Sequence, residues 1–224
     1  MTTITDTSLL RLLQLSSATL PVGGYAFSQG LEYAVDKGWL KNAEDVRAWL
    51  SLQLQQSLAN TDLPLLARQL RAARIQDCEK MIYWNHYTLA CRETSELRLN
   101  DTAMGAAMVR LLSHLDVPMP LRDQQEITFV AAFAMAAAHW QIDTRIACQG
   151  YLWSWLENQV AAATKLVPLG QTSAQQLLGE LLPEIPQAID YSETIADGAI
   201  GGSLPAVAMA SAWHETQYSR LFRS

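Results

Sequence analysis

The feature that most constrains the fold is the spacing of apolar residues in residues 96–115. Six apolar side chains recur there at intervals of i, i+3, i+4, i+7, i+8 and i+11: Met104, Ala107, Met108, Leu111, Leu112 and Leu115. This spacing places them on one face of an α-helix, because each helical turn takes 3.6 residues. Similar helical patterns recur along the chain, whereas runs that alternate with period two are few. We therefore predict an all-α protein.

The length and composition bound the number of domains. The chain has 224 residues, half of them apolar, which is enough to bury a sizeable core. No stretch has the composition of a flexible linker, and we find no internal repeat. We expect a single-domain helical bundle of about nine to ten helices that spans residues 1–224.

Several side chains predict where helices begin and how they pack. Residues with short polar side chains precede helical patterns and are predicted N-caps: Asn42, Asp77, Asp123, Asp143, and Thr172 or Ser173. The helix predicted over residues 144–167 is apolar nearly all round, so we expect it to be central. Gly105 lies on the helix of residues 96–115, where it favours close approach by another helix.

A turn-forming stretch at residues 20–32 stands between the first apolar helix and the next one. Gly23 and Gly24 permit positive φ, and Tyr25 and Phe27 follow at period two, so they share one side if the chain is extended. These aromatic side chains either cap the core of a helix–helix connection or face a partner. Residue physics alone favours the core interpretation.

The charge distribution argues against nucleic acid as the main partner. The net charge is −6. Residues 146–219 hold seven acidic residues and one basic residue, Lys165, whereas the last five residues contain Arg220 and Arg223. An acidic half followed by a cationic tail fits a basic partner, and an ordinary solvated face is the alternative.

The sequence also bears on where the protein works. Residues 1–7 lack the pattern of a signal peptide, and the most apolar run, residues 129–138, is too short to cross a membrane. The three scattered cysteines suit free thiols in a reducing compartment. We expect a cytoplasmic protein that has no contact with a membrane.

No familiar catalytic or metal-binding motif is present. The chain lacks a phosphate-binding loop with its Lys, a Gly-x-Ser-x-Gly elbow, a His-Glu-x-x-His helix and a Cys-x-x-Cys pair. We therefore expect a helical interaction protein with no catalytic residue and no cofactor of its own. An enzyme or metal carrier whose site is assembled from distant residues such as His86, Cys91 and His139 is the alternative.

The C-terminal segment, residues 214–224, is a predicted docking tail. Arg220 and Arg223 flank the apolar pair Leu221 and Phe222, and such a pair at a chain end needs a place to be buried. That place is either the protein's own domain or a partner. We expect the tail to be mobile in the free protein, or held by a neighbouring copy, and to become ordered on the partner.

Four segments of the chain resemble, in this order, the urease accessory protein F (UreF) family. They are residues 20–32, residues 93–105 with the motif Glu-Thr-Ser-Glu-Leu at their start, residues 165–171 with the sequence Lys-Leu-Val-Pro-Leu-Gly-Gln, and the end Ser-Arg-Leu-Phe-Arg-Ser. Each piece alone is weakly specific, but together they cover the chain from end to end.

The resemblance implies a function and a set of partners. It implies an all-helical homodimer that binds urease accessory protein D, called H in some species, and that recruits the GTPase UreG. The assembly delivers nickel to apo-urease, and the UreF protein acts as its scaffold and as a proposed regulator of GTP hydrolysis.

The resemblance also implies roles for individual residues. Five tail residues would contact the D/H partner: Arg220, Leu221, Phe222, Arg223 and Ser224. Three residues of the matching motifs would lie on or near the surface that meets the GTPase: Tyr25, Glu32 and Lys165.

Overall fold

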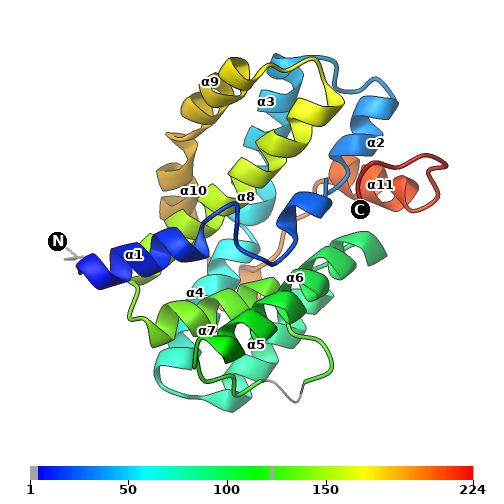
Figure 1. Cartoon of the computed structure of the whole chain (residues 1–224). Coiled ribbons are helices and arrows are strands. Elements are labelled where there is room, and N and C mark those ends of the chain that lie inside the picture. Colours follow the sequence, from blue (N-terminus) through cyan, green and yellow to red (C-terminus); the bar gives the residue numbers. More distant parts are fainter. Residues whose placement is uncertain (1–4, 122–123, 224) are drawn as a thin grey trace.

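A computed structural model describes residues 5–121 and 124–223. These residues form eleven α-helices, two 3₁₀ turns and a π-helical segment, with no strand among them (Figure 1). The all-α prediction is confirmed, and the six-residue helix α2 takes the number of helices above the nine to ten expected. The helices are α1 (Asp6–Leu15), α2 (Leu31–Asp36), α3 (Ala43–Leu52), α4 (Asp62–Arg74), α5 (Cys78–Ala90), α6 (Ser95–His114), α7 (Phe129–His139), α8 (Thr144–Leu166), α9 (Gln171–Leu181), α10 (Glu184–Ser192) and α11 (Pro205–His214).

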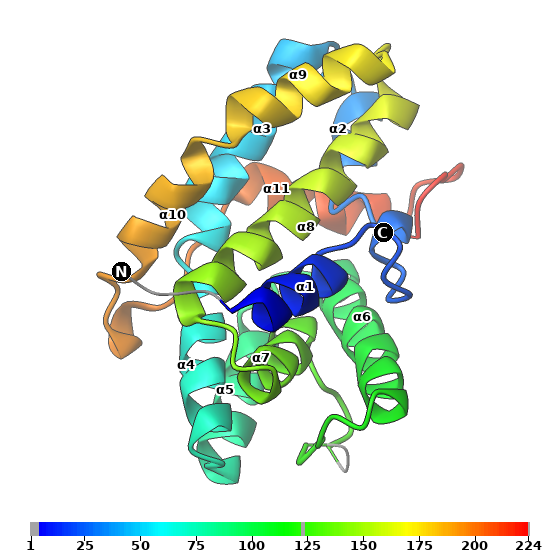
Figure 2. The same cartoon turned by 60° about the vertical axis from the view of Figure 1, so that its left-hand side comes forward.

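Helix α8 links the two halves of the molecule. Helices α4 to α7 gather in the lower half of Figures 1 and 2, and α3, α9 and α10 lie in the upper half. Helix α8 runs between the halves and contacts α1, α4, α7, α9 and α10. This position explains why its sequence is apolar nearly all round, and it confirms the predicted central helix. No helix in the described part of the chain is long and apolar enough to cross a membrane.

The innermost part of the lower half is the alanine-rich helix α7. Its residues 129–137 are all buried, and it packs most extensively against α4 and α6. Alanine side chains are short, so neighbouring backbones can come close to this helix on several sides. Tight packing of this kind makes the lower half sensitive to any added volume.

Local capping is confirmed at three of the predicted sites, whereas the cap predicted at Thr172 or Ser173 is wrong because α9 begins at Gln171, after Gly170. The side chains of Asn42, Asp77 and Asp143 accept hydrogen bonds from backbone N–H groups in the first turns of α3, α5 and α8. The start predicted for α7 is wrong. That helix begins at Phe129 with Thr128 as its N-cap, and Asp123 lies outside the described residues.

Tertiary contacts set the start of α7. The amide oxygen of Asn85 accepts a hydrogen bond of 2.9 Å from the backbone N–H of Thr128. A carboxylate oxygen of Asp101 accepts one of 2.7 Å from the N–H of Phe129. These acceptors belong to α5 and α6, and they add to the local cap in which the Thr128 hydroxyl accepts the N–H of Ala131.

We predict that Gly105→Ala destabilises the protein. A Cβ atom on Gly105 would lie 1.9 Å from the carbonyl oxygen of Ile127, so the backbone before α7 would have to move away from α6. We expect a loss of about 2–3 kcal/mol in the free energy of unfolding, measured by urea denaturation.

The matched control for Gly105→Ala is Gly179→Ala in α9. Nothing lies within 4 Å of a Cβ built on Gly179, so the exchange should stabilise its helix by about 0.5–1 kcal/mol. Equal effects of the two exchanges would show that α6 does not approach the residues before α7 as closely as the structure places it.

Candidate partner-binding surface

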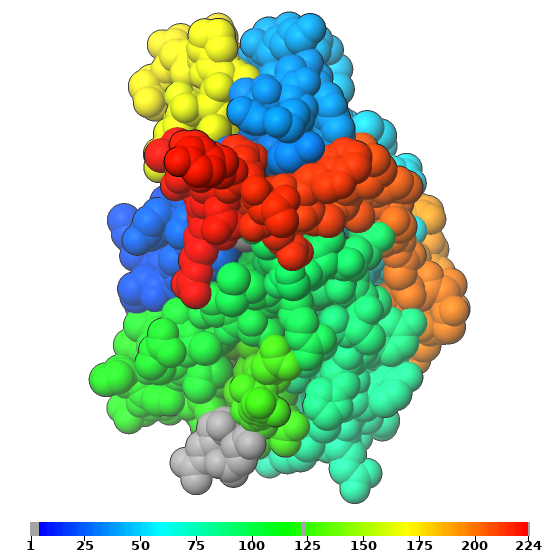
Figure 3. Space-filling model, turned by 90° about the vertical axis from the view of Figure 1, so that its right-hand side faces the viewer, coloured from blue at the N-terminus to red at the C-terminus, as the bar shows by residue number. Residues whose placement is uncertain are grey.

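The C-terminal tail is folded back onto its own domain. Helix α11 and the tail run across one face of the molecule, between α2 and α3 above and α6 below (Figure 3). Phe222 is only 5 % exposed, and the backbone N–H of Arg223 donates a hydrogen bond of 2.8 Å to the carbonyl of Ala26. The described part of the tail therefore has a docking place on its own domain, the expected ordering of the tail on a partner stays a prediction, and Ser224 lies outside the described residues.

Glu32 is the main anchor of the tail. Its two carboxylate oxygens accept hydrogen bonds from the backbone N–H groups of Leu221 at 2.6 Å and Phe222 at 2.9 Å. The same carboxylate faces the Nε2 atom of His214 at 3.0 Å. Glu32 itself is buried, so it acts on any partner through the tail that it holds.

His214 joins the tail to helices α2 and α6. Its ring is fully buried, and its Nδ1 atom lies 2.9 and 3.1 Å from the two carboxylate oxygens of Glu96. The Nη1 atom of Arg220 is 3.1 Å from Glu96 Oε1. Burial raises the pKa of the Glu96 carboxyl, and the nearby His214 and Arg220 oppose that rise. Two carboxylates and two basic side chains therefore meet under the tail.

Tyr25 and Phe27 do not share one side of the chain. The segment Gly24–Ala26 is a 3₁₀ turn instead of an extended strand, and Gly23 before it has a φ of 79°. The turn leaves Tyr25 65 % exposed and buries Phe27. The core interpretation therefore holds for Phe27, whereas Tyr25 faces solvent.

Lys165 lies at the C-terminal end of α8 and is exposed, so it is not a buried structural lysine. Its Nζ atom lies 5.5 Å from the centre of the Phe222 ring. The guanidinium of Arg223 lies 5.9 Å from the centre of the Phe27 ring. Both contacts are at cation–π distance. The residues predicted for two different partners therefore meet around one tail.

The outward side of this region carries apolar groups. Leu221 is 62 % exposed, and Trp213 on α11 is 44 % exposed. The rings of Tyr33, Trp39 and Trp213 form a cluster with centroid separations of 5.6–6.2 Å. A hollow of ≈ 460 Å³ next to this cluster is lined by α2 and residues 216–219. Sequence reasoning missed the cluster, because its members come from separate elements and no spacing connects them.

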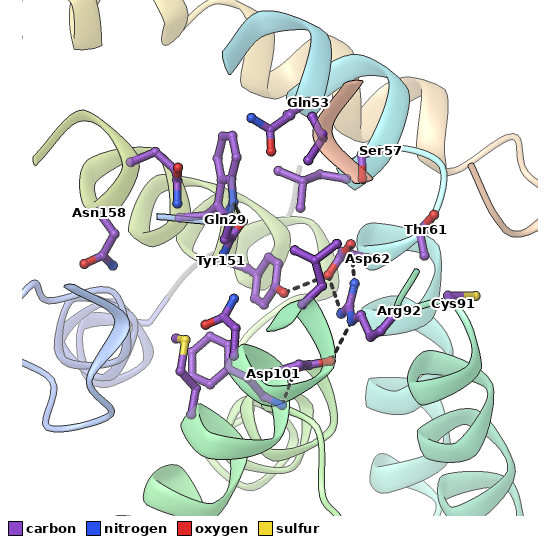
Figure 4. A pocket seen from close by; sticks show the side chains of 18 of the residues that line it. Gln29, Gln53, Ser57, Thr61, Asp62, Cys91, Arg92, Asp101, Tyr151 and Asn158 are labelled. Carbon is purple, nitrogen blue, oxygen red and sulfur yellow. Dashed lines mark hydrogen bonds and ion pairs between the residues drawn. The ribbon is translucent and has the colours of Figure 1, made fainter. Parts of the chain in front are cut away.

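A second, internal pocket of ≈ 100 Å³ lies between the two halves (Figure 4). One wall is an ion-pair network in which Arg92 binds Asp62 and Asp101 at 2.8 Å each. The phenol of Tyr151 donates a hydrogen bond of 3.0 Å to Asp62. Burial raises the pKa of the Asp101 carboxyl and that of the Tyr151 phenol. The network connects α4, α6 and α8, and no sequence motif predicted it.

The residues proposed for a metal site do not come together. In residues 5–121 and 124–223, no group of three or more His, Cys, Asp or Glu side chains has a geometry that could hold a metal ion. His86 on α5 and His139 at the end of α7 are exposed, and Cys91 is half-buried beside the internal pocket. Burial raises the pKa of the Cys91 thiol, which disfavours the thiolate that binds metals.

The fold defines a class of protein, an all-helical protein whose C-terminal tail docks on its own domain and builds part of its exposed face. Comparison with known proteins supplies the family. Residues 40–182 match the UreF family model. A urease accessory protein UreF from Marinomonas sp. (strain MWYL1) is 60 % identical over 220 residues, which cover 98 % of this chain and 96 % of that protein. The urease accessory protein UreF of Pseudomonas entomophila (strain L48) is 46 % identical over 222 residues, or 98 % of this chain and 99 % of that one. The chain therefore belongs to the UreF family of urease accessory proteins.

Proposed function

We propose that this protein is a non-catalytic, cytoplasmic scaffold in urease maturation. As a homodimer it binds urease accessory protein D/H and recruits the GTPase UreG for the insertion of nickel into apo-urease. Nickel passes through the assembly as cargo and is not a resident cofactor of this chain. Family membership supports the role in urease maturation, and the partners are inferred from the family resemblance.

The observation that carries the proposal is the convergence of the predicted binding residues. Tyr25 and Lys165 are 140 residues apart in the sequence, yet both lie beside the tail. Ala26, next to Tyr25, accepts the N–H of Arg223, and Lys165 lies near the Phe222 ring. Tyr25 and Leu221 present more than half of their surface to solvent. Exposed aromatic and aliphatic side chains next to cations are typical of protein interfaces.

Different residues of the tail surface are assigned to the two partners. Leu221 and the exposed Arg223 are available to the D/H partner while Phe222 stays buried. Tyr25 and Lys165 border the same tail and are assigned to the GTPase side. A D/H partner that contacts the tail would thereby shape the neighbouring surface for the GTPase.

We predict that Tyr25→Ala weakens assembly with D/H and UreG by about tenfold. The melting temperature should not change, because the Tyr25 ring is exposed to solvent and is not part of the core. Titration calorimetry with purified D/H, followed by UreG, measures the change. Tyr83→Ala on α5 is the matched control, since Tyr83 is 56 % exposed. A lower melting temperature with normal assembly would assign Tyr25 to the fold instead.

Nickel binding separates the scaffold from the carrier alternative. We expect the isolated protein to hold well below one tightly bound nickel ion per chain in equilibrium dialysis. A carrier would bind nickel stoichiometrically and would lose it on replacement of His86, Cys91 or His139 by alanine. That result would overturn the scaffold assignment.

A further inference from the structure

The internal pocket between the two halves is lined by polar side chains that lack partners in the described part of the chain (Figure 4). Four such side chains come from four separate places in the fold and are only 1–7 % exposed: Gln53, Thr61, Asn100 and Gln159. The atoms without a hydrogen bond to a described residue are Gln53 Nε2, Thr61 Oγ1, Asn100 Oδ1 and Gln159 Oε1. Buried polar atoms without partners are costly, so four of them around one pocket indicate an occupant.

The backbone around the pocket is irregular as well. Gln53 is the first residue of the π-helical segment η2 (Gln53–Leu58). Gln29 also lines the pocket, and its φ of 51° is uncommon for a residue other than glycine. Its Oε1 atom accepts a hydrogen bond of 2.9 Å from the indole N–H of Trp155. Both kinds of irregular backbone are frequent at functional sites.

The charges of the pocket wall argue for an uncharged ligand. Arg92 binds Asp62 and Asp101, and these three side chains carry a net charge of −1, which disfavours an anion. A cation would have to compete with the Arg92 guanidinium for the two carboxylates. Glu93, the remaining charged residue of the wall, is exposed to solvent.

The side chains without partners require a ligand that both donates and accepts hydrogen bonds. Three of the four are amides, and each amide offers an oxygen acceptor and an NH₂ donor. A primary amide is the matching uncharged ligand, because its carbonyl accepts from one side-chain NH₂ while its own NH₂ donates to the oxygen of another. The pocket volume of ≈ 100 Å³ leaves room for about four to six non-hydrogen atoms.

We propose that the internal pocket is a binding site for a small primary amide. The amide side chains of Gln53, Asn100 and Gln159 hold the ligand by hydrogen bonds, and the Thr61 hydroxyl adds a donor and an acceptor. The site belongs to the isolated chain, and it neither includes the tail surface nor depends on the function proposed above.

Three probes of nearly equal shape test this site in the full-length protein: acetamide, the acetate anion and the acetamidinium cation. The reporter is the indole N–H signal of Trp155 in a ¹⁵N-labelled sample, because Trp155 lines the pocket and Trp213 does not. We expect acetamide to shift the Trp155 signal saturably, with a Kd on the order of 1 mM, and to leave the Trp213 signal in place. Acetate and acetamidinium should bind at least about tenfold more weakly.

Near-isosteric variants identify the groups that bind the probe. Gln159→Met and Asn100→Leu each remove an amide and keep the size of the side chain, so each should weaken acetamide binding by about tenfold. Gln69→Met is the matched control. Gln69 is 1 % exposed, and its Nε2 atom also lacks a partner among the described residues, but it does not line the pocket. This variant should bind acetamide like the wild-type protein.

The outcomes separate the amide site from its alternatives. If the wild-type protein shows no saturable binding of acetamide, the pocket holds water only and the proposal is wrong. Equal or tighter binding of acetate or acetamidinium would equally overturn it, and so would a loss in Gln69→Met as large as in Gln159→Met. Circular dichroism checks the fold of each variant, and the probe series on the wild-type protein decides by itself if a variant does not fold. None of these results bears on the binding of D/H or UreG.

Discussion

Replacement of Arg92 by alanine should lower the free energy of unfolding by about 3–5 kcal/mol, because it leaves two buried carboxylates without their cation. Asp62 and Asp101 are 3 % and 5 % exposed, and both lie 2.8 Å from the Arg92 guanidinium. Asp101 also accepts a hydrogen bond from the first N–H of α7, so loss of Arg92 should also destabilise α7 at the centre of the lower half. Urea denaturation followed by circular dichroism gives the value.

The pH dependence of this loss has a defined direction. Burial already raises the pKa of Asp101 in the intact protein, and removal of Arg92 should raise it further. A carboxyl group whose pKa is higher in the folded than in the unfolded state favours folding when it is protonated, and that contribution is lost as pH rises through the folded pKa. The penalty of Arg92→Ala should therefore be largest near neutral pH and smaller at acid pH.

Arg98→Ala is the control for Arg92→Ala. Arg98 pairs with Glu126, and the two side chains are 43 % and 38 % exposed. Exposed pairs contribute little, so we expect a loss below about 1 kcal/mol. If both arginine exchanges cost the same, the Arg92 network is more hydrated than its burial indicates and does not hold α4, α6 and α8 together.

Deletion of residues 220–224 should weaken binding to the D/H partner by about 100-fold, because it removes the central apolar and cationic groups of the proposed interface. The fold should also lose about 2 kcal/mol, since the deletion exposes the site of Phe222 to water. The stability part of this prediction comes from the structure. Residue patterns alone leave open whether the protein's own domain or a partner buries Phe222, and the family resemblance assigns it to the partner.

Two point variants separate these effects of the tail. Leu221→Ala should weaken D/H binding and leave stability unchanged, because Leu221 is 62 % exposed. Phe222→Ala should lower stability. Ile75→Ala serves as the control, with 63 % exposure at the end of α4. Titration calorimetry decides the matter, and full affinity of the deletion variant for D/H would show that the tail is not the docking element.

Local sequence determined the helices of this protein. Apolar spacing gave the correct class, and polar side chains such as Asn42 and Asp143 marked helix starts correctly, because both signals act within about four residues. Gly105 likewise signalled a close contact without revealing its partner. Four short motifs were enough to indicate the UreF family, since they follow one another along nearly the whole chain.

Tertiary structure alone decided which side chains meet. Glu32 and His214 are 182 positions apart in the sequence, and Arg92 and Asp62 are 30 apart, so no local pattern pairs them. The same holds for the docked tail. A Phe near the chain terminus needs burial, but whether its own domain or a partner covers it depends on how the helices pack. Packing brings Glu32 of α2 and Lys165 of α8 to the tail, where the Glu32 carboxylate accepts the N–H groups of Leu221 and Phe222.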